Sequence, residues 1–346
     1  MKFSNLEGIK SLAVVGATGL VGQEFLALLA EHKIAIPRLV LLASENSEGE
    51  TVEVDGKDYT VETLSGDSFD GIEVAFFSVP DAVTKKYAPI ATAHGCLVID
   101  DSSVFRMDPN VPLVVPEVNG SLLRQFEGSL VSVPNCTVTP LTAAIAPLVN
   151  LFGVKRIVVS TYQSVSGAGK DAYDELSEQA ASMLNGMPKE SSVFPRPIAF
   201  NCLPQIGAVE ENGYTSEEMK LVKETRKILG IDTLKISSTT VRVPTFCAHA
   251  LSVNVEFEKN FDKIEEIREL LDKTPGIKVI DQPENHVYPT NLDAIGSDEV
   301  FVGRIRRDYS VGSGVNLWIV ADNLRKGAAL NALQILETLY NYRRMA

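Results

Sequence analysis

The sequence has few cysteines and no long apolar run. Its 346 residues include four cysteines, Cys96, Cys136, Cys202 and Cys247, and no two of them form a C-x-x-C pair. So few cysteines exclude a dense disulfide framework. No apolar run is long enough to span a bilayer, and "MKFSNLEGIK" lacks the layout of a signal peptide. We therefore expect a cytoplasmic protein with no membrane partner and no metal.

Positive charge is also scarce. Lys and Arg number 32 against 45 Asp and Glu, so the formal net charge is −13 at pH 7. This balance argues against nucleic acid as a partner, but an anionic small molecule needs only a local cluster of cations. The 45% hydrophobic and 22% charged residues are typical of a globular protein, and the length suits two domains.

The pattern of apolar and polar residues changes along the chain. Up to about residue 135, short apolar strands alternate with helices, which predicts a parallel sheet wound on both sides. The strands expected later are longer and alternate polar with apolar residues, which favours a mixed or antiparallel sheet with one exposed face. These strands are at 155–165, 234–243, 250–258 and 315–322, with helices at 171–184, 216–229 and 261–272. We expect residues 194–207 to form an ordered loop or an inter-subunit segment, and the last helix to pack on the first domain.

The stretch "GATGLVG" follows a predicted strand and opens a predicted helix. It places Gly16, Gly19 and Gly22 at G-x-x-G-x-x-G spacing. Glycines there allow a tight turn and let backbone N–H groups approach a pyrophosphate at the helix N-terminus. Such turns also occur as packing devices, but the strand and helix around this one favour a bound dinucleotide.

In such a fold, the loop at the end of the second strand contacts the adenosine ribose of the dinucleotide. Here that segment is "LLASENSEGE". An acidic residue suits a free 2′-hydroxyl, and Arg or Lys suits a 2′-phosphate. The loop offers Ser44, Asn46 and Ser47 together with Glu45 and Glu48, and no cation. From this segment the choice between NAD and NADP stays open.

Cys136 follows a short predicted strand and the turn Pro134-Asn135. Apolar residues at helical spacing begin at Thr137, so we expect Cys136 at a helix N-terminus, where an anion is favoured. A buried structural cysteine is the alternative. Among the four histidines, His249 lies between "VRVPTFCA" and a strand and is the candidate base for a Cys–His pair.

Three cations are candidate anion ligands. Arg106 lies in "DDSSVFRMD", Arg242 in "VRVPTF", and Lys220 three residues after Glu217 on a helix. Each could equally be an ordinary surface or salt-bridged residue. With a thiolate, a base and a nucleotide turn, they suit thioester chemistry coupled to hydride transfer.

The sequence resembles the aspartate-β-semialdehyde dehydrogenase family along nearly its whole length. The resemblance is carried by eight blocks in order: "VVGATGLVG", "DDSSVFRMD", "VPEVN", "SVPNCT", "TYQSVSGAGK", "EEMKLVKETRKIL", "VRVPTFCAHALSVNVE" and "ADNLRKGAALNALQI". It implies an α/β fold similar to glyceraldehyde-3-phosphate dehydrogenase. A Rossmann-type parallel sheet domain would span 1–135 plus about 323–346. A mixed or antiparallel α+β catalytic and dimerisation domain would span 136–322.

The resemblance also implies residue roles. Cys136 would be the acyl-thioester nucleophile, His249 the acid/base and Gln163 the residue that orients the substrate. Arg242 would pair with the substrate α-carboxylate and Glu217 with its amino group. The remaining implied sites are Arg106, Lys220 and Asn135 for the phosphate, and Thr18, Gly19, Leu20, Val21, Ser166, Gly167 and Asn323 for the cofactor.

The implied reaction reduces β-aspartyl phosphate to aspartate semialdehyde with NADPH, in the biosynthesis of lysine and diaminopimelate, threonine and methionine, by a homodimer or homotetramer. Two departures concern the family's usual Asn-Pro-Asn-Cys, which here begins with Val133, and an expected Arg at Asn46. The alternatives are N-acetyl-γ-glutamyl-phosphate reductase, which Glu217 disfavours because it suits a free ammonium, and a catalytically silent nucleotide-binding paralogue.

Overall fold

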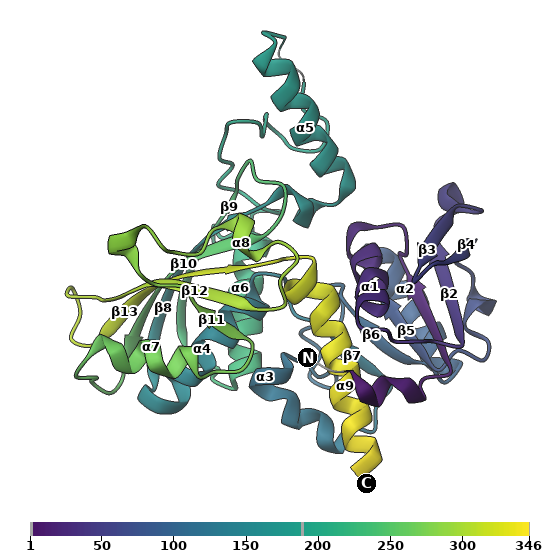
Figure 1. The fold of residues 1–346 in the computed structure, drawn as a ribbon, viewed down its shortest axis with the longest axis horizontal. Coiled ribbons are helices and arrows are strands. Elements are labelled where there is room, and N and C mark those ends of the chain that lie inside the picture. Colours follow the sequence, from purple (N-terminus) through teal and green to yellow (C-terminus); the bar gives the residue numbers. More distant parts are fainter. Residues whose placement is uncertain (1–2, 188–189, 346) are drawn as a thin grey trace. The chain divides into compact units, whose positions relative to one another are not determined.

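The chain folds into two compact units. A computed structural model describes residues 3–187 and 190–345. One unit comprises Met1–Asn135 with Ala328–Ala346, and the other comprises Cys136–Gly327. The first unit therefore draws on both ends of the chain, so that the C-terminal helix, yellow in Figure 1, belongs with the purple and blue elements.

The first unit is organised around a seven-stranded sheet in the order β3-β4-β2-β1-β5-β6-β7. All neighbours are parallel except β3 and β4, which form an antiparallel hairpin. The strands are β1 (Ser11–Val15), β2 (Arg38–Ala43), β3 (Thr51–Val54), β4 (Lys57–Thr63), β5 (Val74–Phe77), β6 (Leu97–Asp100) and β7 (Leu130–Ser132).

Helices cover both faces of this sheet, as a buried parallel sheet requires. Leu12 and Val14 of β1 join one apolar cluster with α1 (Leu20–Glu31) and α9 (Leu330–Met345). The alternate residues Ala13 and Val15 join a second cluster with α2 (Asp81–Ala93). The short helix α3 (Pro116–Asn119) lies against α9. The expected packing of the last helix on the first domain is thus confirmed.

The second unit contains a six-stranded mixed sheet in the order β11-β12-β13-β10-β8-β9. β8 and β9 are parallel, whereas β10 is antiparallel to both β8 and β13. The strands are β8 (Val154–Gln163), β9 (Lys235–Arg242), β10 (His249–Phe257), β11 (Ile277–Val279), β12 (Val300–Arg307) and β13 (Gly314–Ala321). The helices are α4 (Val138–Phe152), α5 (Lys170–Leu184), α6 (Ser216–Leu229), α7 (Ile264–Asp272) and α8 (Asn291–Ala294).

One face of this sheet is covered and the other is open. Along β10, apolar side chains such as Val253 and Val255 are fully buried, while Ser252 and Asn254 between them are only half-buried. The buried face packs on α4, α6 and α7, which contact the sheet strands. The predicted sheet with one exposed face is therefore confirmed, and with it the expected α/β fold of two unlike sheets.

The proline-rich stretch 194–207 is an ordered loop tied to α5. Gln179 accepts hydrogen bonds from the backbone N–H groups of Ile198 and Ala199, at 2.9 and 3.2 Å. Just before this stretch, Ser192 donates to the buried carboxylate of Glu175 at 2.7 Å. Burial raises the pKa of Glu175, but hydrogen bonds from the Ser192 hydroxyl and from the backbone N–H groups of residues 192–194 outweigh it and hold the pKa below its usual range.

The expected helix at 261–272 begins three residues late. Phe261 is buried before the helix, with its ring 5.8 Å from that of Phe257. Glu266 then accepts hydrogen bonds from the N–H groups of Asp262 and Lys263, so its carboxylate caps the helix start. An aromatic anchor and a cap therefore replace the first turn that the apolar spacing suggested.

Candidate active site

The glycine turn of the first unit is fixed by close backbone contacts. Gly16 follows β1 with a positive φ of 92°, and a Cβ there would lie 2.2 Å from the carbonyl oxygen of Ser78. A Cβ on Gly22 would lie 2.1 Å from the carbonyl oxygen of Gly16. Gly19 is the N-cap of α1 and contributes no side chain. Glycine-lined backbone thus leads into a helix N-terminus, which fits a dinucleotide pyrophosphate. Thr18, Leu20 and Val21 are half-buried around this turn.

The loop after β2 lies beside the glycine turn. Ser44 follows β2 and is the N-cap of one short helical turn at residues 45–47. The hydroxyl oxygens of Ser47 and Thr18 are 3.3 Å apart, so the two segments touch. Asn46 is exposed. Glu48 accepts a hydrogen bond from Thr63 at 3.0 Å, which turns its carboxylate toward β4.

Two further candidates of the first unit lie at the ends of its strands. Arg106 is buried after β6 and donates to the backbone oxygen of Asp101 at 2.7 Å, with the carboxylate of Asp101 at 3.9 Å. Asn135 is buried and is the last residue of the unit before Cys136.

The register of the second sheet gathers most of the predicted catalytic and substrate-binding residues at one edge. The last residues of the parallel strands β8 and β9, Gln163 and Arg242, are paired. His249 begins the neighbouring antiparallel strand β10 and pairs with Ala321, the last residue of β13. Because an antiparallel strand starts where its neighbour ends, these side chains emerge at the same edge. Asn323 follows two residues after β13.

A chain of polar contacts connects the substrate-binding candidates. The Gln163 amide donates to one carboxylate oxygen of Glu217 at 3.2 Å. Lys220 pairs with the other carboxylate oxygen at 3.2 Å. Arg242 is buried and donates to the backbone oxygen of Ser164 at 2.7 Å. Burial lowers the pKa of Arg242, while the negative charges of Glu217 and Cys136 oppose that shift.

His249 is completely buried at the same edge. Its Nδ1 lies 3.0 Å from the backbone N–H donor of Ser164 and 3.0 Å from the Ser164 hydroxyl. Its Nε2 has no hydrogen-bond partner among the described residues. Burial, reinforced by the charge of Arg242, lowers the pKa of His249 to about 3, so the imidazole is neutral at pH 7.

Cys136 lies in the turn just before α4. The helix begins at Val138 with Thr137 as its N-cap, so Cys136 precedes the helix instead of opening it, because Thr137 takes the capping position. Cys136 is half-buried. A Cβ on Gly327 would lie 3.0 Å from the Cys136 Cβ, so the π-helical turn at residues 325–329 approaches it closely. The electrostatic interaction with Arg242 links the thiolate to the carboxylate-binding candidate.

Ser166 and Gly167 form a short turn next to these groups. The turn is held by backbone hydrogen bonds from Val165 to Thr245 and from Ser166 to Phe246. A Cβ on Gly167 would lie 3.1 Å from His249 Nε2 and 3.2 Å from Arg242 Nη1. Gly167 therefore leaves room directly in front of the imidazole.

Ser164 is the residue that the sequence analysis missed. Its backbone carbonyl binds Arg242 and its backbone N–H binds His249. Every residue type has a backbone carbonyl and every type except proline has a backbone N–H, so no side-chain pattern marks this role. Its position directly after Gln163 is the one available indication.

The first unit carries a nucleotide turn, and the second carries a thiol, a neutral imidazole and a buried guanidinium. No cluster of three metal-binding side chains occurs among residues 3–187 and 190–345. A nicotinamide-dependent dehydrogenase with a cysteine nucleophile requires groups of these kinds.

Comparison with known proteins identifies the family. Residues 11–126 match the family model for the semialdehyde dehydrogenase NAD-binding domain, and residues 145–326 match the one for the dimerisation domain. Aspartate-semialdehyde dehydrogenase of Aquifex aeolicus is 48% identical over 332 residues, 95% of this chain and 97% of that protein. The enzyme of Bacillus subtilis is 43% identical over 335 residues, again 95% of this chain and 96% of that protein.

Solved structures agree. Aspartate semialdehyde dehydrogenase II of Vibrio cholerae, solved as a complex with ASA, has a TM-score of 0.91 and 44% identity, covering 96% of this chain and 98% of that one. The chain belongs to the aspartate-semialdehyde dehydrogenase family.

Gly167→Ala tests the space before the imidazole. The added methyl group would press on both His249 Nε2 and Arg242 Nη1. Misplacing catalytic groups by a fraction of an ångström lowers kcat/KM, here by about tenfold or more. Gly312→Ala is the matched control, since its Cβ would meet no atom within 4 Å. Steady-state kinetics and thermal melts compare the two, and equal kinetics would contradict the crowding.

Proposed function

We propose that this chain forms aspartate semialdehyde from β-aspartyl phosphate, with Cys136 as the covalent nucleophile. The Cys136 thiolate attacks the acyl carbon, the C–S bond forms and phosphate leaves with the electron pair of the broken C–O bond. When bound, the reduced nicotinamide cofactor supplies a hydride to the acyl carbon. The observation that carries the proposal is that Gln163, Arg242 and His249 meet at one edge of the second sheet in a chain of this family.

The substrate's charged groups find partners at the sheet edge. Arg242 is buried with one guanidinium nitrogen on Ser164, which leaves its fork suited to the α-carboxylate. The Glu217 carboxylate suits the α-ammonium, and Gln163, bonded to Glu217, orients the substrate. Lys220, Arg106 and Asn135 hold the phosphate, and His249 acts as the acid/base. Ser166 and Gly167 approach the cofactor.

The carboxylate of Glu217 favours this substrate over an acylated amine. N-acetyl-γ-glutamyl phosphate carries no ammonium, so a buried carboxylate would face an uncharged amide. A silent nucleotide-binding paralogue would have no need of Cys136, Gln163, Arg242 and His249 together. Aspartate-pathway biosynthesis, in a cytoplasmic setting, is the role that follows.

Cys136→Ser tests the covalent step. A hydroxyl is far less acidic than a thiol and forms no thioester, so we expect less than ~1% of the wild-type kcat with an intact fold. Cys202→Ser is the control, because Cys202 is exposed. Phosphate-dependent oxidation of aspartate semialdehyde measures both variants. If Cys136→Ser kept more than ~10% of activity, the covalent mechanism would be wrong.

We propose NADP as the working cofactor, with a small preference over NAD. Ser44, Asn46 and Ser47 can donate hydrogen bonds to a 2′-phosphate, but residues 44–50 contain three glutamates and no cation. Charge-assisted hydrogen bonds are roughly twice as strong as neutral ones. The absence of a cation here therefore weakens discrimination between the two cofactors.

Asn46→Arg tests this loop. The exposed position allows an Arg to reach a 2′-phosphate, so kcat/KM for NADP should rise by about tenfold while that for NAD stays nearly unchanged. Asn46→Gln, similar in polarity but uncharged, serves as the control. An unchanged NADP/NAD ratio would mean that the 2′-phosphate is held elsewhere.

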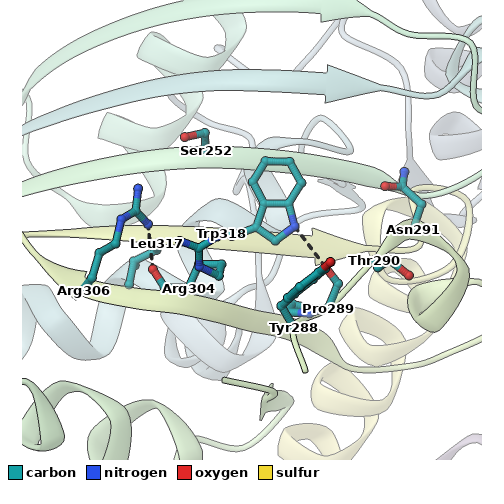
Figure 2. Close-up of a pocket in the computed structure, with 9 residues that line it drawn as sticks. All are labelled: Ser252, Tyr288, Pro289, Thr290, Asn291, Arg304, Arg306, Leu317 and Trp318. Atoms are coloured by element: carbon teal, nitrogen blue, oxygen red, sulfur yellow. Dashed lines mark hydrogen bonds between the residues drawn. The ribbon is translucent and has the colours of Figure 1, made fainter. Parts of the chain in front are cut away.

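We propose that two copies associate through the open face of the second sheet, as a homodimer or as half of a homotetramer. The face carries a cavity of about 400 Å³ lined by Ser252, Tyr288, Trp318, Arg304, Arg306 and four neighbouring residues. Figure 2 shows the hydrogen bond that the Trp318 indole N–H donates to the backbone oxygen of Pro289, at 3.1 Å. A face of aromatic and arginine side chains is typical of interfaces.

No helix of the described residues is long and apolar enough to cross a membrane.

Ser252→Glu tests the dimer face. Two copies related by a two-fold axis would bring two buried carboxylates together, which costs several kcal/mol. Sedimentation at micromolar concentration should show a shift from dimer to monomer, with circular dichroism unchanged. Tyr309→Glu, at a side chain that is 90% exposed in the β12–β13 turn, should leave the dimer intact. A monomeric wild-type protein would contradict the assignment.

A further inference from the structure

We propose that Ser164 and Asn323 are positioning residues that hold His249 as the Nε2-protonated tautomer, so that it acts as a hydrogen-bond donor to the oxygen of the Cys136-bound intermediate. This inference rests on the proposed function and replaces the acid/base role given there to His249 with that of a fixed hydrogen-bond donor. It also gives Asn323 a task other than the cofactor contact that the family resemblance implies.

The tautomer of the His249 ring follows from the hydrogen bond that the Ser164 backbone N–H donates to it. A backbone N–H can only donate, and that of Ser164 points at His249 Nδ1 from 3.0 Å. Nδ1 must therefore be the unprotonated nitrogen. A neutral imidazole then carries its proton on Nε2, the nitrogen with no hydrogen-bond partner in the described structure. This nitrogen faces the space that Gly167 leaves open.

Asn323 fixes the residues on both sides of the imidazole. Its side-chain oxygen lies 3.1 Å from the Ser164 hydroxyl and accepts a hydrogen bond from the Ala248 N–H at 3.0 Å. Ala248, directly before His249, has a positive φ of 65°, a strained conformation that needs such support. With its hydroxyl donating to Asn323, Ser164 presents its backbone N–H to Nδ1.

Asn323 is itself immobilised. It is 2% exposed, and Ser166 lies within 3.1 Å of both its amide oxygen and its amide nitrogen. All the polar atoms of its side chain are thus engaged in holding the turn 164–166 and the start of β10. A side chain so engaged acts on the reaction through its neighbours.

The charges around the imidazole favour the neutral form. Complete burial opposes a positive charge on the ring most strongly and Arg242 opposes it further, which outweighs the opposite effects of Glu217 and of the Ala248 backbone. A second proton would in addition have to enter at Nδ1, against the Ser164 N–H. The resting imidazole can therefore donate from Nε2 but has no free site for the Cys136 thiol proton.

The reduction of the thioester balances in atoms and electrons when His249 acts only as a hydrogen-bond donor. Hydride addition to the thioester carbon converts its C=O into an alkoxide that still carries the C–S bond. The Nε2–H donates a hydrogen bond to that oxygen. When the C–S bond breaks, its electron pair returns to sulfur, the C=O bond re-forms and the aldehyde leaves a thiolate behind. The proton stays on Nε2 throughout, so the oxyanion is stabilised without a proton-transfer step.

Nitrogen-15 NMR of the histidine-labelled protein, free of ligands, tests the tautomer without reference to the reaction. The chain has four histidines, and His249→Gln assigns the resonances of His249 by their disappearance. We expect protonated Nε2 and unprotonated Nδ1 at pH 7. A proton on Nδ1 would overturn the proposal even if the enzyme reduced β-aspartyl phosphate as proposed, and the expected tautomer in an enzyme without that activity would overturn the proposed function instead.

Asn323→Ala tests the positioning. We expect kcat to fall at least tenfold, KM for NADP to stay within twofold, and the Nδ1-protonated form to become detectable. Asn323→Asp keeps the acceptor oxygen and should recover part of the kcat. Asn185→Ala, whose side chain bonds the Ala181 carbonyl of its own helix, is the matched control.

A raised KM for NADP with unchanged His249 resonances would make Asn323 a cofactor residue and overturn the inference. Should Asn323→Ala fail to fold, Ser164→Ala replaces it. That variant keeps the N–H to Nδ1 but loses the link to Asn323, so it should keep the tautomer and lower kcat more than KM. An unaffected kcat would likewise count against positioning.

Discussion

The backbone of one residue, Ser164, joins the two buried nitrogen bases of the candidate site. The Ser164 carbonyl accepts a hydrogen bond from Arg242 and its N–H donates to His249, at 2.7 and 3.0 Å. A buried guanidinium and a buried imidazole next to each other would be unstable if both were charged. The backbone of Ser164 favours different charge states in the two groups, because its carbonyl oxygen accepts a hydrogen bond from the cation and its N–H donates one to the neutral ring.

The sheet holds Ser164 in place. β8 delivers Gln163 and Ser164 to an edge that β9 reaches with Arg242 and that β10 leaves with His249. A shift of any of these strands by one residue would turn its side chains to the opposite face. The positions of the candidate catalytic residues thus depend on strand register. The helices α4, α6 and α7 cover the buried face of the sheet.

The sequence predicts regular elements better than contacts. The helix expected at 216–229 has those bounds in the structure, where Thr215 and Glu218 form a capping box and Gly230 ends it in a left-handed conformation. β12 escaped prediction because Gly303 and a bulge, with Arg304 at a positive φ, interrupt its alternation. The candidate side chains could be proposed from sequence blocks, whereas the role of Ser164 could not, since its bonds to Arg242 and His249 are made by backbone atoms.

The composition of the first unit has a consequence for synthesis on the ribosome. Its core includes Leu333 and Leu336 of α9, which pack with strand residues made some 300 residues earlier, such as Leu12 and Val14. Until the last helix leaves the exit tunnel, that apolar face has no cover, while all of Cys136–Gly327 has already been translated. Domains usually fold in order from the N-terminus. Here the nucleotide-binding unit is begun first and completed last, which makes the nascent chain a natural client of chaperones that shield exposed apolar surface.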